Sequence, residues 1–304
     1  MHMRNWTRMK LYKATCLGVI VTLQVSLICV PAFTEERKLK PGFNLFSKEQ
    51  DVQLGKESAA QVEKQMQVVN NKDLENFINQ IGRKLIATPE ADAKSFAYSF
   101  KVVNEKSINA FALPGGPAFI HTGLITAADN EAQVAGVMAH EISHVALRHG
   151  TNQVSKANLI ELPAALAGTV SGGSMIGQLA QIGVGVGAHS VLLKFSRNAE
   201  RDADLLGTRI MSGAGYNPIE MARFFEKLES QTGAPSSSFE QFLSDHPNPG
   251  NRVKAVEEEI GYLPKRSYTT DSGQIGRMKQ IIAKLPPPPP PPKTAKQATG
   301  SPGQ

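Results

Sequence analysis

The amino-acid sequence predicts an α+β fold that is mostly helical and carries one small β-sheet. Charged and apolar residues alternate at helical spacing over residues 45–69 and 72–87, and helical patterns return from residue 129 to residue 262. Only residues 96–122 show the alternation that is typical of strands. The chain has 304 residues, of which 41% are hydrophobic, so it is long enough to bury a sizeable core.

Residues 1–32 have the pattern of an export signal. Basic residues up to Lys13 precede a mainly apolar run, and Ala32 precedes two glutamates. We expect cleavage after Ala32; the alternative is an uncleaved anchor, because the apolar run is close to the shortest length that spans a bilayer. Both cysteines, Cys16 and Cys29, lie in this leader, so the count of two does not predict a disulfide.

Helices and strands follow the leader in a clear order. Two helices are expected at residues 45–69 and 72–87. A small sheet is then expected from residues 96–103, 108–113 and 118–122, with a turn at Pro114-Gly115-Gly116 between the last two.

A helix is predicted to begin near Asp129. Asn130 and Gln133 are spaced as an N-cap and its N3 partner, and Gly150 is the expected stop. From there to Tyr262 the sequence predicts helices joined by short loops.

Residues 159–195 are apolar but rich in glycine, and they include Gln178, Gln181 and His189. The polar residues suit a buried helical hairpin. The glycine spacing would also suit helix packing in lipid, so contact with a membrane surface is the alternative.

The C-terminal part contains a short amphipathic candidate helix at residues 273–285, then seven consecutive prolines at 286–292. Such a run favours a polyproline II rod. The rod is either a spacer or a ligand for a partner with an aromatic groove. We therefore divide the chain into a signal peptide (1–32), one domain (33–262) and a basic, proline-rich tail (263–304).

The charge distribution argues against a nucleic-acid partner. The formal net charge is +6, but residues 1–32 carry four basic residues without an acid, and residues 263–304 carry seven against one. Residues 33–262 therefore hold 22 of the 33 basic and 26 of the 27 acidic residues. A domain with a net charge of −4 lacks the basic excess that phosphate binding requires.

The strongest chemical motif is His140-Glu141-Ile142-Ser143-His144. Two histidines at positions i and i+4 of a helix point the same way and can hold one zinc ion. Glu141 lies about 100° around such a helix, within reach of a water on the metal, and could take its proton.

A catalytic zinc needs a third protein ligand, and Glu200 is the candidate. Asp204 follows one helical turn later and could accept the free ring N–H of a zinc-bound histidine. The alternative is a solvated charged face, because residues 200–204 carry four charges.

Together these motifs resemble the HtpX/BepA/LoiP-like zinc metallopeptidases, gluzincins related to the CAAX prenyl proteases. The resemblance covers roughly residues 45–262 and rests on four motifs in order: Asn109-Ala110-Phe111-Ala112-Leu113-Pro114-Gly115-Gly116, the histidine pair with Glu141, the segment Ser196 to Asp204, and His246-Pro247 with Arg252.

The resemblance implies a mostly helical zincin with zinc ligands His140, His144 and Glu200 and the general base Glu141. In related peptidases an exposed strand beside the active-site helix pairs with substrate. The region from Asn109 to Thr122 matches that segment.

The candidate substrate contacts on this strand are therefore Asn109, Phe111 and Leu113. The chain lacks the helical repeats of BepA-like members and the clear multiple membrane spans of HtpX-like members. We therefore do not expect this chain to dock partners through such repeats or to be a membrane-embedded protease.

Three other polar residues have open roles. His149 lies about 140° from His144 on a continuous helix. We therefore expect it to support the fold or to contact a metal-ligating residue, and not to bind the metal itself. Arg252 would hold a substrate carboxylate or the oxyanion, or it is a buried arginine paired with an acid. His246, expected in a loop, would close the fourth metal position, donate to the oxyanion, or make no metal contact.

His121 and His189 have no partner at ligand spacing, and we expect no metal role for them. The function expected is a zinc-dependent endopeptidase that acts on unfolded or misassembled envelope proteins. Its expected location is the periplasm or envelope. The alternative is a proteolytically idle assembly factor or chaperone that keeps zinc as a structural clamp.

Overall fold

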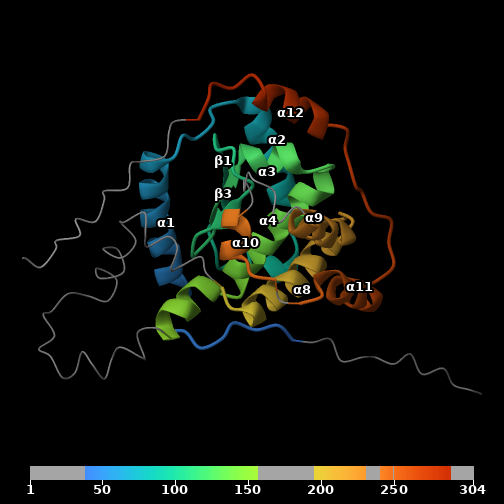
Figure 1. Cartoon of the computed structure of the whole chain (residues 1–304). Helices are drawn as coiled ribbons and strands as arrows, with labels where there is room; N and C mark the ends of the chain where they lie inside the picture. The colour runs from blue at the N-terminus through green and yellow to red at the C-terminus, as the bar shows by residue number, and fades with distance from the viewer. Residues whose placement is uncertain (1–37, 157–194, 231–239, 249, 289–304) are drawn as a thin grey trace, which may run out of the picture. The chain divides into compact units, whose positions relative to one another are not determined.

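The computed structural model describes residues 38–156, 195–230, 240–248 and 250–288 (Figure 1). In these ranges the protein is mostly helical with one three-stranded sheet, which confirms the predicted α+β class. The signal peptide, most of the glycine-rich segment with His189, and the tail beyond residue 288 lie outside the described residues. The elements are α1 (Lys48–Gln65), α2 (Lys72–Ile86), a 3-10 turn η1 (Pro89–Ala91), β1 (Ser99–Val103), β2 (Ala110–Ala112), β3 (Pro117–His121), α3 (Thr122–Ala127), α4 (Glu131–Ala146), α8 (Arg197–Gly213), α9 (Ile219–Ser230), α10 (Glu240–Asp245), α11 (Arg252–Tyr262) and α12 (Ile275–Ile282).

Helices α1 and α2 begin at side-chain caps. Ser47 and Gln50 form a capping box at α1, and Asn71 accepts two backbone N–H groups at the start of α2. The predicted first helix was too long at its end. It stops at Gln65 because the Val69 N–H instead donates to Val102 O of β1.

The sheet has the order β1-β3-β2, with β1 parallel and β2 antiparallel to β3. The predicted turn between β2 and β3 needs its glycines. Gly115 has φ +77° and Gly116 has φ +127°, and a Cβ on Gly115 would lie 2.4 Å from the Cα of Val52. The turn therefore packs directly against α1.

Helix α4 is buried along its whole length and contacts β2, α2, α8 and α9, so in Figure 1 it runs between the sheet and the later helices. Its start is as predicted: the Asn130 side chain accepts the Gln133 N–H. Its predicted stop at Gly150 was wrong. The helix ends at Ala146, Arg148 adopts φ +56°, and residues 149–156 form a separate helical segment.

The end of α4 has an identifiable cause. Arg148 donates from Nε to Asp51 Oδ2 at 2.6 Å and from Nη2 to Phe46 O at 2.6 Å. These two bonds stabilise a left-handed backbone that a residue other than glycine rarely adopts.

The packed structure continues beyond Tyr262. Thr269 pairs with Tyr216, the Ala132 N–H of α4 donates to Thr270 O, and Ile275 and Met278 of α12 are buried. The expected boundary at residue 262 therefore does not coincide with the end of the core. The apolar face of the predicted amphipathic segment packs against α2 and α3.

Within the described ranges, no helix combines the length and the apolar character that crossing a bilayer would require.

Candidate metal centre

Helix α4 presents His140 and His144 one turn apart on the same face. Their Nε2 atoms are 3.0 Å apart, and both side chains are buried. Aromatic rings fix the imidazoles: Phe225 packs edge-on against His140 at 5.4 Å between centroids, and Phe195 stacks on His144 at 3.9 Å. The sequence analysis did not identify these two phenylalanines.

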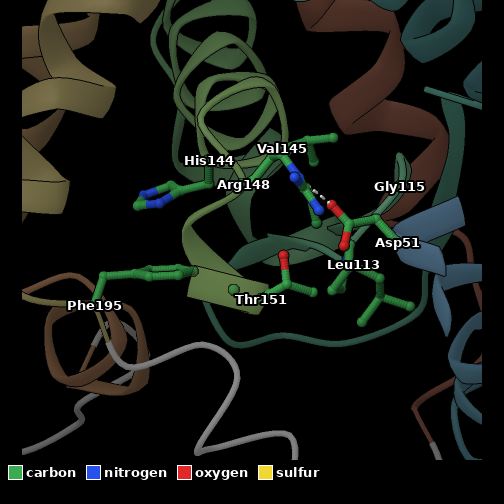
Figure 2. A pocket seen from close by; sticks show the side chains of 11 residues that line it. Asp51, Leu113, Gly115, His144, Val145, Arg148, Thr151 and Phe195 are labelled. Carbon is green, nitrogen blue, oxygen red and sulfur yellow. Dashed lines mark hydrogen bonds and ion pairs between the residues drawn. The ribbon is translucent and has the colours of Figure 1, made fainter. Parts of the chain in front are cut away.

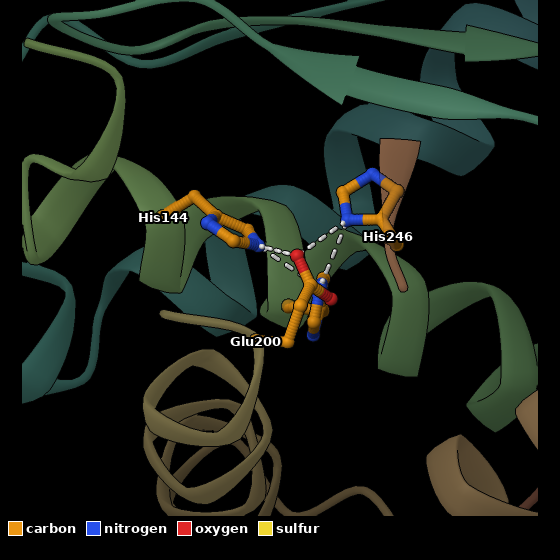
Figure 3. Close-up of side chains that lie close together, drawn as sticks. His144, Glu200 and His246 are labelled. Atoms are coloured by element: carbon orange, nitrogen blue, oxygen red, sulfur yellow. Dashed lines mark hydrogen bonds and ion pairs between the residues drawn. The ribbon is translucent and has the colours of Figure 1, made fainter. Parts of the chain in front are cut away.

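Helix α8 brings Glu200 to the same point (Figure 3). Glu200 Oε2 is 3.2 Å from His140 Nε2, and Oε1 is 3.4 Å from His144 Nε2. Glu200 and Asp204 are 0% and 1% exposed, so the alternative of a solvated charged face is wrong for both.

His246 completes the cluster. It is the residue after α10, and its N–H donates to Phe242 O. Its Nδ1 is 3.3 Å from His140 Nε2 and 3.2 Å from Glu200 Oε1, and Figure 3 shows the contact with Glu200 as a dashed line. The ring is 1% exposed, so the option of a loop histidine away from the cluster does not hold.

The donor set fits a zinc ion. Zinc binds imidazole nitrogen and carboxylate oxygen at about 2.0–2.1 Å in a tetrahedron, which separates ligand atoms by about 3.3 Å. The distances given above lie between 3.0 and 3.4 Å, with Glu200 meeting His140 through Oε2 and the other two histidines through Oε1. Glu200 Oε2 is buried and accepts no hydrogen bond from the described residues, and a cation would satisfy it. When one ligand atom is taken from each of the four residues of the cluster, these four atoms all lie within 4.8 Å of one another.

Glu141 lies between the cluster and the sheet. Its Oε2 accepts the Ala112 N–H of β2 at 3.0 Å, and its Oε1 is 3.4 Å from His246 Nε2. Burial raises the pKa of this carboxyl, although His246 and His140 oppose the shift. One oxygen is thus held by the strand, and the other faces the cluster.

A buried charge pair supports His140 from behind. Asp204 Oδ1 lies 3.0 Å from His140 Nδ1, as the sequence predicted. Arg252 donates to both oxygens of Asp204, at 2.9 and 2.7 Å, and its guanidinium lies 4.0 Å from the centroid of Phe225. Arg252 is 4% exposed and paired with Asp204, which agrees with the buried-pair alternative.

These charges set the protonation of the metal-free cluster. Burial alone would lower the pKa of His140, but Glu200 and Asp204 outweigh it and raise this pKa to about 9. Burial likewise opposes ionisation of Glu200, yet His246 and His140 hold its pKa well below the usual value. A metal ion would therefore replace a proton on His140, so its binding would depend on pH.

His149 contacts the cluster by a route that a continuous helix would not allow. The turn at Arg148 brings its Nδ1 to 2.9 Å from His144 Nδ1. Burial lowers the pKa of His149 to about 4, so its neutral ring can accept the His144 Nδ1–H. His121 lies elsewhere, with its Nδ1 2.9 Å from Ser107 Oγ.

The strand residues predicted to contact substrate direct their backbone N–H and C=O groups toward β3. Asn109 O accepts the His121 N–H and the Leu113 N–H donates to Pro117 O, so alternate residues of β2 bond to β3. Phe111, paired with Phe119, belongs to the same set. The peptide groups on the side of β2 that faces away from β3 belong instead to Ala110 and Ala112, whose N–H groups donate to Asn109 Oδ1 and Glu141 Oε2.

Residues 72–260 match peptidase family M48. The beta-barrel assembly-enhancing protease of Escherichia coli (strain K12) is 30% identical over 253 residues, covering 79% of this chain and 50% of that protein. The mitochondrial metalloendopeptidase OMA1 of Saccharomyces cerevisiae (strain ATCC 204508 / S288c) is 30% identical over 213 residues, covering 67% and 59%. The chain spans about half the length of the first of these relatives. The family match covers more than half of the chain and includes all four residues of the cluster, so this chain belongs to peptidase family M48.

Proposed function

We propose that this chain is a zinc-dependent endopeptidase whose metal ligands are His140, His144 and Glu200. The observation that carries the proposal is the buried cluster, in which two histidines and a carboxylate lie at zinc-ligand spacing beside Glu141. The names of both relatives, a protease and a metalloendopeptidase, support it. When bound, zinc would lower the pKa of a water and polarise the substrate carbonyl.

Glu141 moves the protons of the reaction. Its free oxygen, Oε1, accepts the proton of the attacking water and later gives it to the leaving amine. The Ala112 N–H holds Oε2, which keeps the carboxylate in one orientation between strand and cluster. The burial that raises the pKa of Glu141 makes its carboxylate a stronger base for the water proton.

His246 would be the fourth ligand of a resting, closed site. Its Nδ1 lies at ligand spacing from both His140 and Glu200. A catalytic zinc keeps one position open, so His246 would have to move away from the cluster before a substrate could bind. His246 precedes Pro247 and a turn at Gly250, where φ is +119°, and this short turn-rich segment allows the displacement.

The substrates are unfolded or misassembled proteins of the cell envelope. The edge of β2 that faces away from β3 would pair with an extended chain through the carbonyl groups of Ala110 and Ala112, since their N–H groups donate to Asn109 and Glu141. Backbone pairing selects unfolded segments more than particular sequences. Export through the leader at residues 1–32 would bring the protein to the periplasm. The relative named beta-barrel assembly-enhancing protease supports an envelope role.

The fourth ligand also favours a second candidate function. Four-ligand zinc sites are usually structural. A chain whose His246 never leaves would be an idle assembly factor or chaperone of the envelope. It would bind clients without cutting them.

The deciding experiment uses the full chain loaded with zinc and an unfolded protein such as casein. The enzyme cleaves casein, loses this activity with a chelator, and loses it in Glu141→Gln while that variant retains zinc. Client binding that persists in Glu141→Gln, with no cleavage by the native chain, would favour the chaperone.

The leader is tested separately. Intact-mass measurement of the protein recovered from the envelope gives a form that begins at Phe33; retention of residues 1–32 would indicate an anchor.

A further inference from the structure

The helical segment at residues 149–156 reaches the candidate metal centre through its first residue, His149. The Nδ1 atoms of His149 and His144 are 2.9 Å apart, and the two rings meet at 72° with 5.0 Å between their centroids. Two ring nitrogens this close share one hydrogen, so one ring donates and the other accepts. Which ring donates depends on what His144 does with its other nitrogen.

The ligand role of His144 fixes the direction of this hydrogen bond. Its Nε2 lies at ligand spacing in the cluster, 3.0 Å from His140 Nε2 and 3.4 Å from Glu200 Oε1. An imidazole that binds metal through Nε2 carries its hydrogen on Nδ1, so His144 is the donor. His149 must then accept through Nδ1, which makes it a neutral ring with its hydrogen on Nε2.

This hydrogen bond decides which atom of the His144 ring faces the cluster. Phe195 stacks on that ring at 3.9 Å between centroids and 20° between planes, which fixes the ring plane (Figure 2). A turn of about 180° around the Cβ–Cγ bond would keep the plane, because such torsions are roughly two-fold, but it would exchange Nε2 with Cε1. Only the orientation with Nδ1 towards His149 presents Nε2 to His140 and Glu200. Stacking alone therefore does not select the ligand atom, and His149 does.

The two ligand histidines of α4 have supports of different charge. Asp204 lies against His140 Nδ1, and the buried Arg252 balances its negative charge. A neutral acceptor behind His144 needs no such counter-ion. This suits a cluster that already holds the buried carboxylate of Glu200.

The turn at Arg148 brings His149 to its position. On a continuous helix His149 would point about 140° away from His144. Arg148 instead has φ +56°, a left-handed conformation that is unfavourable for any residue with a side chain. Its Nε donates to Asp51 Oδ2 at 2.6 Å, drawn as a dashed line in Figure 2, and its Nη2 donates to Phe46 O at 2.6 Å. The strained residue is thus the one that redirects the next side chain towards the cluster.

Residues 43–51 also bond directly to the helical segment that follows the turn. Asn44 Nδ2 donates to Thr151 Oγ1 at 2.7 Å, and the Leu45 N–H donates to Ser155 Oγ at 2.9 Å. These bonds join residues 107 and 110 positions apart. The placement of the segment therefore depends on a distant part of the chain.

We propose that His149 is a positioning residue, which holds His144 in the orientation that binds metal through Nε2, and that residues 43–51 keep His149 in place through the turn at Arg148. This inference rests on the proposed function, because it takes His144 as a zinc ligand. It gives the strained turn and the contacts of residues 43–51 a role in the metal centre.

Two substitutions at His149 separate its acceptor from its bulk. In His149→Asn the side-chain Oδ1 takes nearly the place of Nδ1 and still accepts, whereas His149→Leu fills the space without an acceptor. Zinc affinity is measured on the full chain by competition with a chromophoric chelator. His149→Leu weakens zinc binding about 10–100-fold, as expected for loss of a group that orients a ligand histidine, and His149→Asn recovers most of that loss.

Cobalt in place of zinc gives a second readout that does not depend on activity. The visible absorption of the cobalt-loaded chain reports the geometry of the ligands. It keeps its native shape in His149→Asn and changes in His149→Leu, because only the second substitution releases the orientation of His144.

A second matched pair tests the turn. Arg148→Ala and Arg148→Gly lose the same contacts with Asp51 and Phe46, but glycine adopts a positive φ without steric cost. Because His144 is supported only when the turn is in place, Arg148→Gly binds zinc several-fold more tightly than Arg148→Ala. Met278→Ala is the control for lost stability, since Met278 is buried in α12, which packs against α2 and α3, and the zinc affinity of this variant stays native.

The outcomes separate this inference from the proposed function. Equal zinc affinity in the native chain and His149→Leu, or equal losses in His149→Leu and His149→Asn, overturns the role of His149. Equal affinities of Arg148→Ala and Arg148→Gly overturn the role of the turn. If the variants follow the expected pattern but the zinc-loaded native chain does not cleave casein, the peptidase function fails and this inference stands. If the native chain binds no zinc, both fail.

Discussion

The substitution Arg252→Met tests whether the buried charge pair behind His140 supports the cluster without contacting substrate. Methionine keeps a flexible apolar side chain of similar length against Phe225, but it removes both hydrogen bonds to Asp204. Asp204 would then be a buried carboxylate with His140 Nδ1 as its nearest remaining partner among the hydrogen bonds and ion pairs described.

The expected magnitude follows from the burial of both partners. Arg252 and Asp204 are 4% and 1% exposed, and removing one partner of such a buried pair costs about 3–5 kcal/mol of unfolding free energy. Disturbing the carboxylate that orients a ligand histidine typically weakens metal binding about 10–100-fold. The double variant Asp204→Asn/Arg252→Met removes both charges, so it recovers most of the lost stability.

The assay is urea unfolding of the native chain and both variants without metal. Zinc affinity and peptidase turnover at saturating zinc are measured on the same proteins. Recovery of turnover in the double variant at saturating zinc is expected, because the proposed proton transfer uses neither residue. A cost below about 1 kcal/mol for Arg252→Met would refute the buried-pair reasoning. Turnover that stays lost in the zinc-saturated double variant would restore Arg252 as a substrate contact.

The remaining predictions concern single residues. Glu141→Gln retains zinc and fold but loses about 10²–10⁴-fold in turnover, since an amide cannot accept the water proton; near-native turnover would contradict this role. His246→Ala keeps zinc and keeps or gains activity if the histidine gates the metal. A sharp fall in activity with zinc retained would instead favour a hydrogen-bond donor to the oxyanion. Loss of zinc would make His246 an essential ligand. Burial lowers the pKa of His121 from 6.5 to about 4, so its neutral form stabilises the fold above pH 6.5, and about 3 kcal/mol is lost as the pH falls towards 4. His121→Gln should flatten that part of the stability profile in urea unfolding, and an unchanged profile would count against it.

Local signals in the sequence were sufficient for the parts of the fold that depend on one segment. The cap at Asn130, the histidine spacing on α4 and the glycine turn after β2 each depend on residues a few positions apart. Even the pairing of Asp204 with His140 could be expected, because a residue one helical turn from Glu200 must lie on the same face.

Features that depend on distant segments could not be predicted in this way. Helix α4 stops at Ala146 because Arg148 is held by Asp51, which is 97 residues earlier, so the glycine at 150 was a misleading signal. The choice between the two roles of Arg252 needed the position of α11 against α8. The open-edge residues of β2 depend on its register with β3, which a strand sequence alone does not give.

The first turn of α4 contacts the segment around Thr270, and this contact affects when the helix can form all its hydrogen bonds during synthesis. The Ala132 N–H is one of the donors that a helix start leaves without an intrahelical partner, and it finds its acceptor at Thr270 O. Ser272 Oγ also donates to the Glu131 carboxylate in that turn. The ribosome makes these partners long after the histidine pair, so a nascent chain would carry both metal ligands of α4 before the start of this helix is fully bonded.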